Sequence, residues 1–307
     1  MLAHFDNDFH FRHDDGVRLL PLLLVLALCG CTASAASDGR ARVLASAYPF
    51  AWAAQQVGGP DVHVTDLVRA GAEPHDVELS PRQVGSFEQA DVVVYLHGFQ
   101  PAVDDAIRES PRRARLDLTR VVDVRPFSSD LTGDSESGVD PHVWVDPLRM
   151  SAIVRAIADR LRSRDPGHAP AYTARETATL ARLADLDAFF RTQLRSCARR
   201  DIVTAHSAFA YLAGRYGLKQ VGVAGISPEA EPSPGRLAKV ARYARAHGVR
   251  TVFFGSDVDP KLADTVAREI HARTAILDPV EGVSGSDDYL SVMRRNAAVL
   301  HDGLGCA

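Results

Sequence analysis

The sequence lacks the patterns that identify several common enzyme classes. No nucleophile elbow, no phosphate-cradling glycine loop and no cysteine–histidine pair occurs in its 307 residues. No C-x-x-C pair is present, which argues against a zinc–thiolate site. The chain also has no excess of positive charge, because it contains 35 Lys and Arg residues and 39 Asp and Glu residues. This balance excludes the basic surface of a nucleic-acid binder. Because the catalytic motifs are missing, we also expect a protein that is not an enzyme.

A long hydrophobic run is absent as well. The most apolar stretch, Leu19–Cys29, is eleven residues long and contains a proline, whereas a membrane-spanning helix needs about 20 residues. Preceded by Arg18, it has the pattern of a secretory signal. It ends in Leu28-Cys29-Gly30-Cys31, which resembles a bacterial lipobox. We therefore expect a signal peptide at 1–31 and a lipid anchor on Cys31; the alternative is ordinary cleavage near Ala33–Ala35.

The residues before Arg18 are acidic where a signal should be basic, so we expect translation to start at Val17. After residue 31 the chain holds 33 cations and 35 anions, a net charge of -2. The small, polar residues 32–41 predict a tether between the lipid and the folded part.

The composition predicts a globular chain with two domains, because 46% of the residues are apolar and 24% are charged. Apolar runs that favour strands alternate with helical patterns, which indicates parallel sheets flanked by helices. The predicted strands are Arg42–Ser46, Val62–Leu67, Val92–Tyr95, Val121–Asp123, Ile202–Ala205, Gln220–Val223, Thr251–Phe254 and Ala275–Leu277.

One segment differs from this alternation. Pro170–Arg195 has no glycine and no internal proline, and its apolar residues recur at three- and four-residue steps. A single helix of this length would span about 37 Å. We expect an α/β fold of two lobes, 42–165 and 198–307, joined by one long linker helix within 166–197, with a ligand site in the cleft between them.

Two cysteines remain after Cys31, namely Cys197 and Cys306. A secreted chain lies in an oxidising compartment, so a disulfide between them is expected. It would constrain the unfolded chain by about 4–5 kcal/mol in the entropic model. The alternatives are two unpaired thiols or, less favoured, a zinc–thiolate site.

Four candidate metal ligands stand out from the rest of the sequence. Of nine histidines after the signal, six lie at helix ends, in a turn or within a strand, and we expect these to be solvated or structural. His75 and His206 follow predicted strands, His142 lies in a Pro-His-Val-Trp segment, and Asp278 follows a strand. Ligands of open α/β sheets bind beyond the carboxyl ends of the strands, so these residues could converge in the cleft.

Three imidazoles and one carboxylate suit Zn²⁺ in tetrahedral geometry, whereas Mg²⁺ and Ca²⁺ prefer more oxygen ligands. Nearby Glu73, Asp76 and Asp140 could orient the imidazoles by hydrogen bonding. The fourth ligand could also be Glu73 or water in place of Asp278.

Four segments of the chain resemble the signature segments of the metal-binding receptor lipoproteins of bacterial ATP-driven (ABC) importers. In chain order they are Gly71–Asp76, Asp140–Pro147, Thr204–Leu212 and Leu277–Pro279. The resemblance covers about Val43 to Leu300. It implies two α/β lobes joined by a long helix, with His75, His142, His206 and Asp278 holding the metal. The histidine at the third position, where manganese-type members tend to be acidic, favours zinc.

The chain departs from this family in two places. Many zinc-type members carry a histidine-rich loop before the second ligand segment, but Ser128–Val139 has no histidine. Gly255 and Ser256 stand where members often have an acidic residue, with Asp257 nearby. These departures concern metal collection and the rim of the cleft.

The expected function is an extracytoplasmic zinc receptor, a monomer anchored to the cell membrane, that delivers Zn²⁺ to the permease and ATPase subunits of an ABC importer. One alternative is a Mn²⁺ or Fe²⁺ receptor of the same class. The others are a surface metallohydrolase with a three-histidine zinc and an adhesin-like surface protein with an incidental metal.

Overall fold

The computed structural model describes residues 39–68, 72–109, 114–127, 138–227, 232–256, 260–283 and 285–307. Residues 40–307 form one compact unit. The predicted signal peptide, Cys31, nearly all of the tether, Gly71, Asp257 and most of Ser128–Val139 lie outside the described residues. No helix among the described residues is long and apolar enough to cross a membrane.

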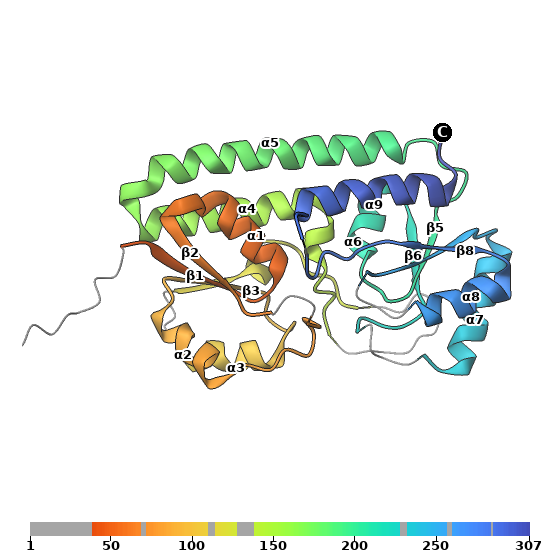
Figure 1. Cartoon of the computed structure of the whole chain (residues 1–307), viewed down its shortest axis with the longest axis horizontal. Coiled ribbons are helices and arrows are strands. Elements are labelled where there is room, and N and C mark those ends of the chain that lie inside the picture. Colours follow the sequence, from red (N-terminus) through yellow and green to blue (C-terminus); the bar gives the residue numbers. More distant parts are fainter. Residues whose placement is uncertain are drawn as a thin grey trace, which may run out of the picture. The chain divides into compact units, whose positions relative to one another are not determined.

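The first lobe is built on a four-stranded parallel sheet with the strand order β2-β1-β3-β4 (Figure 1). Its strands are β1 (Ala41–Ala45), β2 (Val62–Asp66), β3 (Val92–Tyr95) and β4 (Arg115–Asp117). Its helices are α1 (Tyr48–Gly58), α2 (Pro81–Gln89), α3 (Pro101–Glu109) and α4 (Pro147–Arg164).

The second lobe repeats this arrangement with the strand order β6-β5-β7-β8. Its strands are β5 (Asp201–Thr204), β6 (Lys219–Gly222), β7 (Thr251–Phe254) and β8 (Arg273–Ile276). Its helices are α6 (Ala210–Tyr216), α7 (Pro234–Ala246), α8 (Lys261–Ile270) and α9 (Tyr289–Leu304).

Helices cover both faces of each sheet, which explains why the central strands are continuously apolar. All four residues of β3 are buried. Val93 packs with α2 and α3 on one face, while Val92 and Val94 join the core under α1 and α4 on the other. In the second lobe Val203 packs with α7 and α8, and its neighbour Ile202 faces the core that includes α9. The fold class expected from the sequence is confirmed.

The long helix is α5 (Ala169–Gln193), and it contacts helices of both lobes. It packs on α1 and α4 of the first lobe and on α9 of the second, as Figure 1 shows. Leu183, Leu186 and Phe190 of the predicted apolar stripe are fully buried. The lobe boundaries proposed from the sequence stay a prediction.

A disulfide joins Cys197 to Cys306, across 109 positions of sequence. It fastens the C-terminal residues after α9 beside the start of β5, where Ala307 N also donates to Ser196 O. The pairing expected from the sequence is confirmed.

Some local predictions differ from the structure. Val121–Asp123 is not a strand, because the backbone N–H groups of Val121 and Val122 turn back to Leu118 O. The strand lies earlier, at β4, where Leu116 pairs with Val94. Helix α3 was not predicted, and β8 begins two residues before the predicted Ala275. Short segments of this kind carry too few residues for a clear periodicity.

Candidate metal centre

Four buried side chains from four separate segments meet between the two sheets. His75 lies in the loop between β2 and α2, and His142 directly precedes the short 3-10 turn Val143–Val145. His206 is two residues beyond the end of β5, and Glu281 is five residues beyond β8. Their exposed fractions are 8% for His75, 0% for His142, 1% for His206 and 2% for Glu281.

One oxygen of Glu281 lies close to all three imidazoles. Its Oε1 is 2.9 Å from His142 Nε2, 3.6 Å from His75 Nε2 and 3.8 Å from His206 Nε2. The Nε2 atoms of His75 and His142 are 3.3 Å apart. Donor atoms of His75, His142 and Glu281 all lie within 4.8 Å of one another, a grouping that could hold a metal ion.

Two polar atoms at this centre have no hydrogen-bond partner among the described residues. They are His206 Nε2 and Glu281 Oε2, and both are buried. A buried polar atom without a partner is costly and requires an explanation, and a bound ion is one such explanation. These atoms belong to two of the four converging side chains, so their lone pairs are free to bind a cation.

His142 is held in a defined orientation by a carboxylate. Its Nδ1 lies 2.8 Å from Asp140 Oδ1, and the same oxygen accepts the backbone N–H of His142 at 3.0 Å. A carboxylate on Nδ1 directs Nε2 towards the metal and increases the basicity of the ring. This contact supports the orienting role expected for Asp140.

Burial and neighbouring charges shift the pKa values of the groups at the centre. Burial acts to lower the pKa of His142, but hydrogen bonds to Asp140 and Glu281 outweigh burial and raise this pKa to about 9. Burial lowers the pKa of His75. Burial acts to raise the pKa of Glu281, yet the surrounding imidazoles hold it well below its usual value. Without metal, a His142 imidazolium therefore lies between two carboxylates at neutral pH.

The structure brings together His75, His142 and His206 but not Asp278. Asp278 Oδ2 accepts from Ser256 Oγ at 2.6 Å, and its Oδ1 accepts the backbone N–H of Val280 at 2.7 Å. Both oxygens are thus engaged in shaping the chain after β8. The carboxylate at the centre is Glu281 instead, three residues further on.

The turn at Asp278 explains how Glu281 reaches the centre. Val280 has φ 63°, in the left-handed region that β-branched residues rarely adopt. This conformation reverses the chain immediately before Glu281, and Trp144 Nε1 donates to Pro279 O at 2.7 Å from the first lobe. Sequence reasoning missed Glu281 because such a backbone conformation has no sequence signature at a valine.

The two other residues expected to orient imidazoles differ from each other. Glu73 Oε1 accepts the backbone N–H of His75 at 3.0 Å and lies 3.9 Å from His75 Nε2. Glu73 therefore shapes the loop that carries His75. Asp76 is exposed to solvent.

The segment that carries His142 is bonded to the second lobe at several points. Tyr211 Oη donates to Asp140 O, and Tyr289 Oη donates to Trp144 O. Arg215 of α6 donates from Nε and Nη2 to the carboxylate of Asp146, which caps α4. These bonds align the donors of the first lobe with those of the second.

Residues 43–303 match the family model described as zinc-uptake complex component A, periplasmic. The chain belongs to this family. Its members are receptors for zinc uptake rather than enzymes, and the resemblance drawn from the four segments is confirmed.

Two curated relatives show the extent of the similarity. The chain is 31% identical over 301 residues to the high-affinity zinc uptake system protein ZnuA of Bacillus subtilis (strain 168), covering 92% of this chain and 94% of that protein. It is 31% identical to the zinc-binding lipoprotein AdcA of Streptococcus pneumoniae (strain ATCC BAA-255 / R6), covering 92% of this chain but only 59% of AdcA.

Solved structures show the same fold. The laminin-binding protein Lmb of Streptococcus agalactiae, described as bifunctional with adhesin and metal-transporting activity, superposes with a TM-score of 0.77 at 30% identity. The match covers 86% of this chain and 99% of Lmb. The Zn(II)-bound ZnuA-like domain of Streptococcus pneumoniae AdcA gives a TM-score of 0.73 at 30% identity, covering 87% of this chain and 99% of that domain.

Proposed function

We propose that the chain captures Zn²⁺ outside the cytoplasm and delivers it to the permease and ATPase of an ABC importer. The observation that carries this proposal is the convergence of three imidazoles and one carboxylate in a buried centre between two sheets. Membership of the zinc-uptake family and the zinc-binding relatives support the choice of metal and the role in import.

The proposed ligands are His75, His142, His206 and Glu281. Three nitrogen donors and one carboxylate oxygen match the preferred ligands and coordination number of Zn²⁺. All four residues are at least nine-tenths buried, so the centre has the closed shell of a carrier. A catalytic zinc would need an open position beside a base, which makes the metallohydrolase alternative a weaker match.

We also propose that Cys31 is acylated and holds the chain, as a monomer, at the outer face of the cell membrane. The lipobox-like segment supports this location. A zinc-binding relative is named a lipoprotein, which is consistent with the same anchor.

The direct test is equilibrium zinc binding in competition with a chromophoric chelator. The chain beginning at Thr32 would be compared with His75→Ala, His142→Ala, His206→Ala and Glu281→Gln. Each substitution removes a donor, so each should weaken zinc binding by at least about tenfold, the lower limit seen for changes around a metal site.

Two substitutions serve as matched controls. His97→Ala removes an exposed imidazole that pairs with Asp104, and Asp278→Asn changes the carboxylate that the structure places outside the centre. Both should leave zinc affinity within about twofold of the parent. Zinc affinity that responds to Asp278→Asn but not to Glu281→Gln would contradict the proposed ligand set.

Two further results bear on the alternatives. Tighter binding of Mn²⁺ than of Zn²⁺ in the same titration would overturn the choice of metal. Turnover of a model ester that a chelator abolishes would favour the metallohydrolase. For the role in import, deletion of the gene should impair growth in zinc-limited medium, and unimpaired growth would count against it.

A further inference from the structure

Positive side chains gather at the amino-terminal edge of the second sheet. Arg199 and Arg200 directly precede β5, Lys219 begins β6, Arg250 precedes β7, and Arg273 begins β8. The four strands are parallel and in register, with Asp201 opposite Lys219 and Thr251 opposite Arg273. The residues that open these strands therefore lie side by side along one edge.

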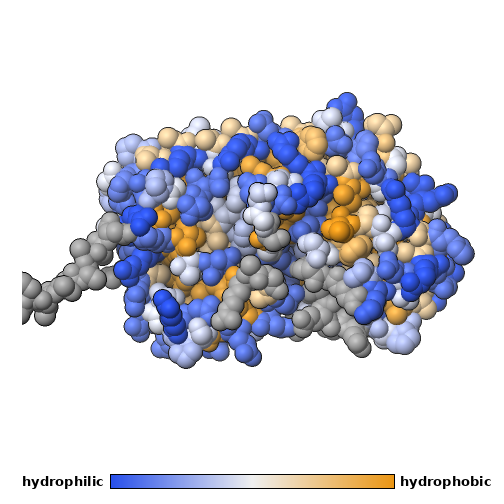
Figure 2. All heavy atoms as spheres, viewed as in Figure 1, coloured by the Kyte–Doolittle hydropathy of each residue, from blue (hydrophilic) through white to orange (hydrophobic). Residues whose placement is uncertain are grey.

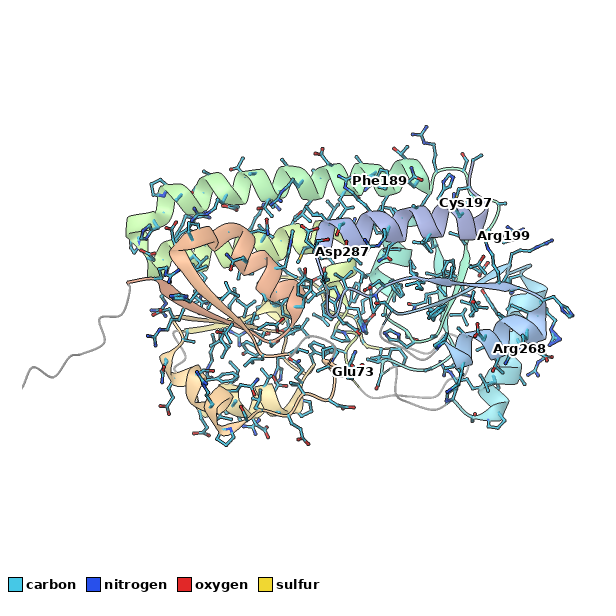
Figure 3. All side chains as sticks on the ribbon, viewed as in Figure 1. Glu73, Phe189, Cys197, Arg199, Arg268 and Asp287 are labelled. Atoms are coloured by element: carbon cyan, nitrogen blue, oxygen red, sulfur yellow. A yellow bond between two sulfur atoms is a disulfide. The ribbon has the colours of Figure 1, made fainter. Side chains whose placement is uncertain are left out.

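Helix ends add further cations to the same edge. Arg245 and Arg268 lie in the last turns of α7 and α8, and Arg195 follows α5. We name this group the basic edge; its members are Arg195, Arg199, Arg200, Lys219, Arg245, Arg250, Arg268 and Arg273. Figure 3 shows Arg199 and Arg268 at the same end of the second lobe, and Figure 2 shows mostly hydrophilic residues there.

The basic edge carries a substantial net charge. Its eight cations are accompanied by three acidic side chains, Asp201, Glu269 and Asp302. The side chains of this edge therefore have a net charge of +5, although the side chains after residue 31 have a net charge of -2. Such a separation of charge creates a local positive potential that the overall composition conceals.

Most of these cations are positioned without being neutralised. Among the described residues, Arg245 is the one member with an ion pair, to Glu269. Arg199 donates to Gly248 O, and Arg273 donates to Asp302 O, so their partners are neutral carbonyl groups. Arg268 donates to the hydroxyl of Thr265. These contacts orient the guanidinium groups while leaving their charge available.

We propose that the basic edge binds the anionic headgroups of a phospholipid bilayer. Guanidinium groups bind phosphate oxygens through paired hydrogen bonds, and clustered Lys and Arg residues are attracted to anionic membranes.

The chemistry of the edge favours a membrane over a protein partner. Protein interfaces usually have an apolar or aromatic centre. The large apolar residues exposed in the described part of the chain are Val84, Leu148 and Ile276, and none belongs to the basic edge. A predicted exported chain would meet lipid headgroups rather than nucleic acid.

The basic edge is separate from the metal centre. His206 follows the carboxyl end of β5, whereas Arg199 and Arg200 precede its amino end. Binding to lipid can therefore be measured without zinc, and its failure would leave the proposed zinc receptor untouched.

The test is co-sedimentation of the unlipidated chain from Thr32 onward with vesicles, without zinc and at physiological ionic strength. Vesicles of mixed phosphatidylglycerol and phosphatidylcholine should bind the chain, whereas phosphatidylcholine alone should not. Each neutralised cation should lower the partition coefficient about fivefold, so Arg195→Gln, Arg250→Gln and Arg268→Gln together should lower it on the order of 100-fold.

The matched control neutralises three exposed arginines outside the basic edge, Arg82→Gln, Arg120→Gln and Arg155→Gln, and so changes the net charge equally. It should retain vesicle binding, and unchanged zinc affinity in both triple variants would show that they fold. If the first variant loses zinc affinity, the three single substitutions replace it. Equal loss of vesicle binding in both variants, binding to heparin but not to phosphatidylglycerol, or no binding to either vesicle would overturn the proposal.

Discussion

His142 and His206 come from opposite lobes and are equally buried, but their surroundings differ. Both nitrogens of His142 have carboxylate partners, Asp140 on Nδ1 and Glu281 on Nε2. His206 Nε2 has no hydrogen-bond partner among the described residues. The first lobe therefore presents an imidazole that already belongs to a charged network, whereas the imidazole of the second lobe has a free donor atom. In the proposed zinc site, His142 would therefore support both the fold and the metal, whereas the imidazole of His206 would act on the metal.

Alanine substitutions of these two histidines should separate the two roles and have the largest effects. Each should weaken zinc binding by at least about tenfold, and by more than substitution of an orienting partner does, because each removes a proposed ligand. Only His142→Ala should also destabilise the zinc-free chain, by about 3 kcal/mol, since it leaves Asp140 and Glu281 buried without their partner. Urea unfolding with a chelator present measures this difference. Equal destabilisation by the two substitutions would show that the contrast is not real.

Asp140→Asn tests whether the orienting carboxylate accounts for the contrast. The substitution keeps the size of the side chain but weakens the contact with His142 Nδ1. Zinc affinity should fall by about 10- to 100-fold, the range measured for partners of metal-bound histidines. Asp76→Asn, which alters an exposed carboxylate in the His75 segment, is the matched control. An unchanged zinc affinity in Asp140→Asn would show that Asp140 does not orient His142.

The proton balance of zinc binding should follow from His142. Its pKa is raised to about 9, so Zn²⁺ must displace a proton from this ring at pH 7.5, and about one proton should be released per zinc. The same shift stabilises the zinc-free fold below the unfolded pKa of about 6.5, and this contribution is lost as pH rises through 9. Calorimetry in buffers of different ionisation enthalpy counts the protons. Release that persists unchanged in His142→Ala would contradict the assignment.

The smallest effect on zinc affinity is expected for Tyr211, which joins the second lobe to the segment that carries His142. Tyr211 Oη accepts from Arg125 N and donates to Asp140 O. Tyr211→Phe removes these two bonds and should lower stability by about 1–3 kcal/mol. Zinc affinity should change only about two- to fivefold, because Asp140 keeps its contact with His142. Chemical unfolding and chelator competition measure both effects. The comparison is Tyr243→Phe in α7, whose hydroxyl donates to Asp201 rather than to the segment that carries His142. A loss of affinity as large as that of Asp140→Asn would show that Tyr211 sets the imidazole geometry directly.

Much of the fold was accessible from local patterns. The long helix was predicted because its apolar stripe extends over many turns, and its buried residues Leu183, Leu186 and Phe190 follow that stripe. Strands such as β3 were predicted because burial on both faces demands a continuous apolar run. The three-residue β4 was missed because it depends on pairing with β3 rather than on its own composition.

The sequence by itself determined the family and the two-lobed α/β architecture. It also identified the three imidazoles, two of which follow predicted strands. Only the tertiary structure decided which carboxylate joins them. Asp278 and Glu281 are three residues apart with the same charge, and the local pattern favoured Asp278 because it directly follows a predicted strand. The left-handed turn at Val280, held by Asp278 itself, directs Glu281 to the imidazoles, and such a turn is set by packing across the lobes rather than by residue type.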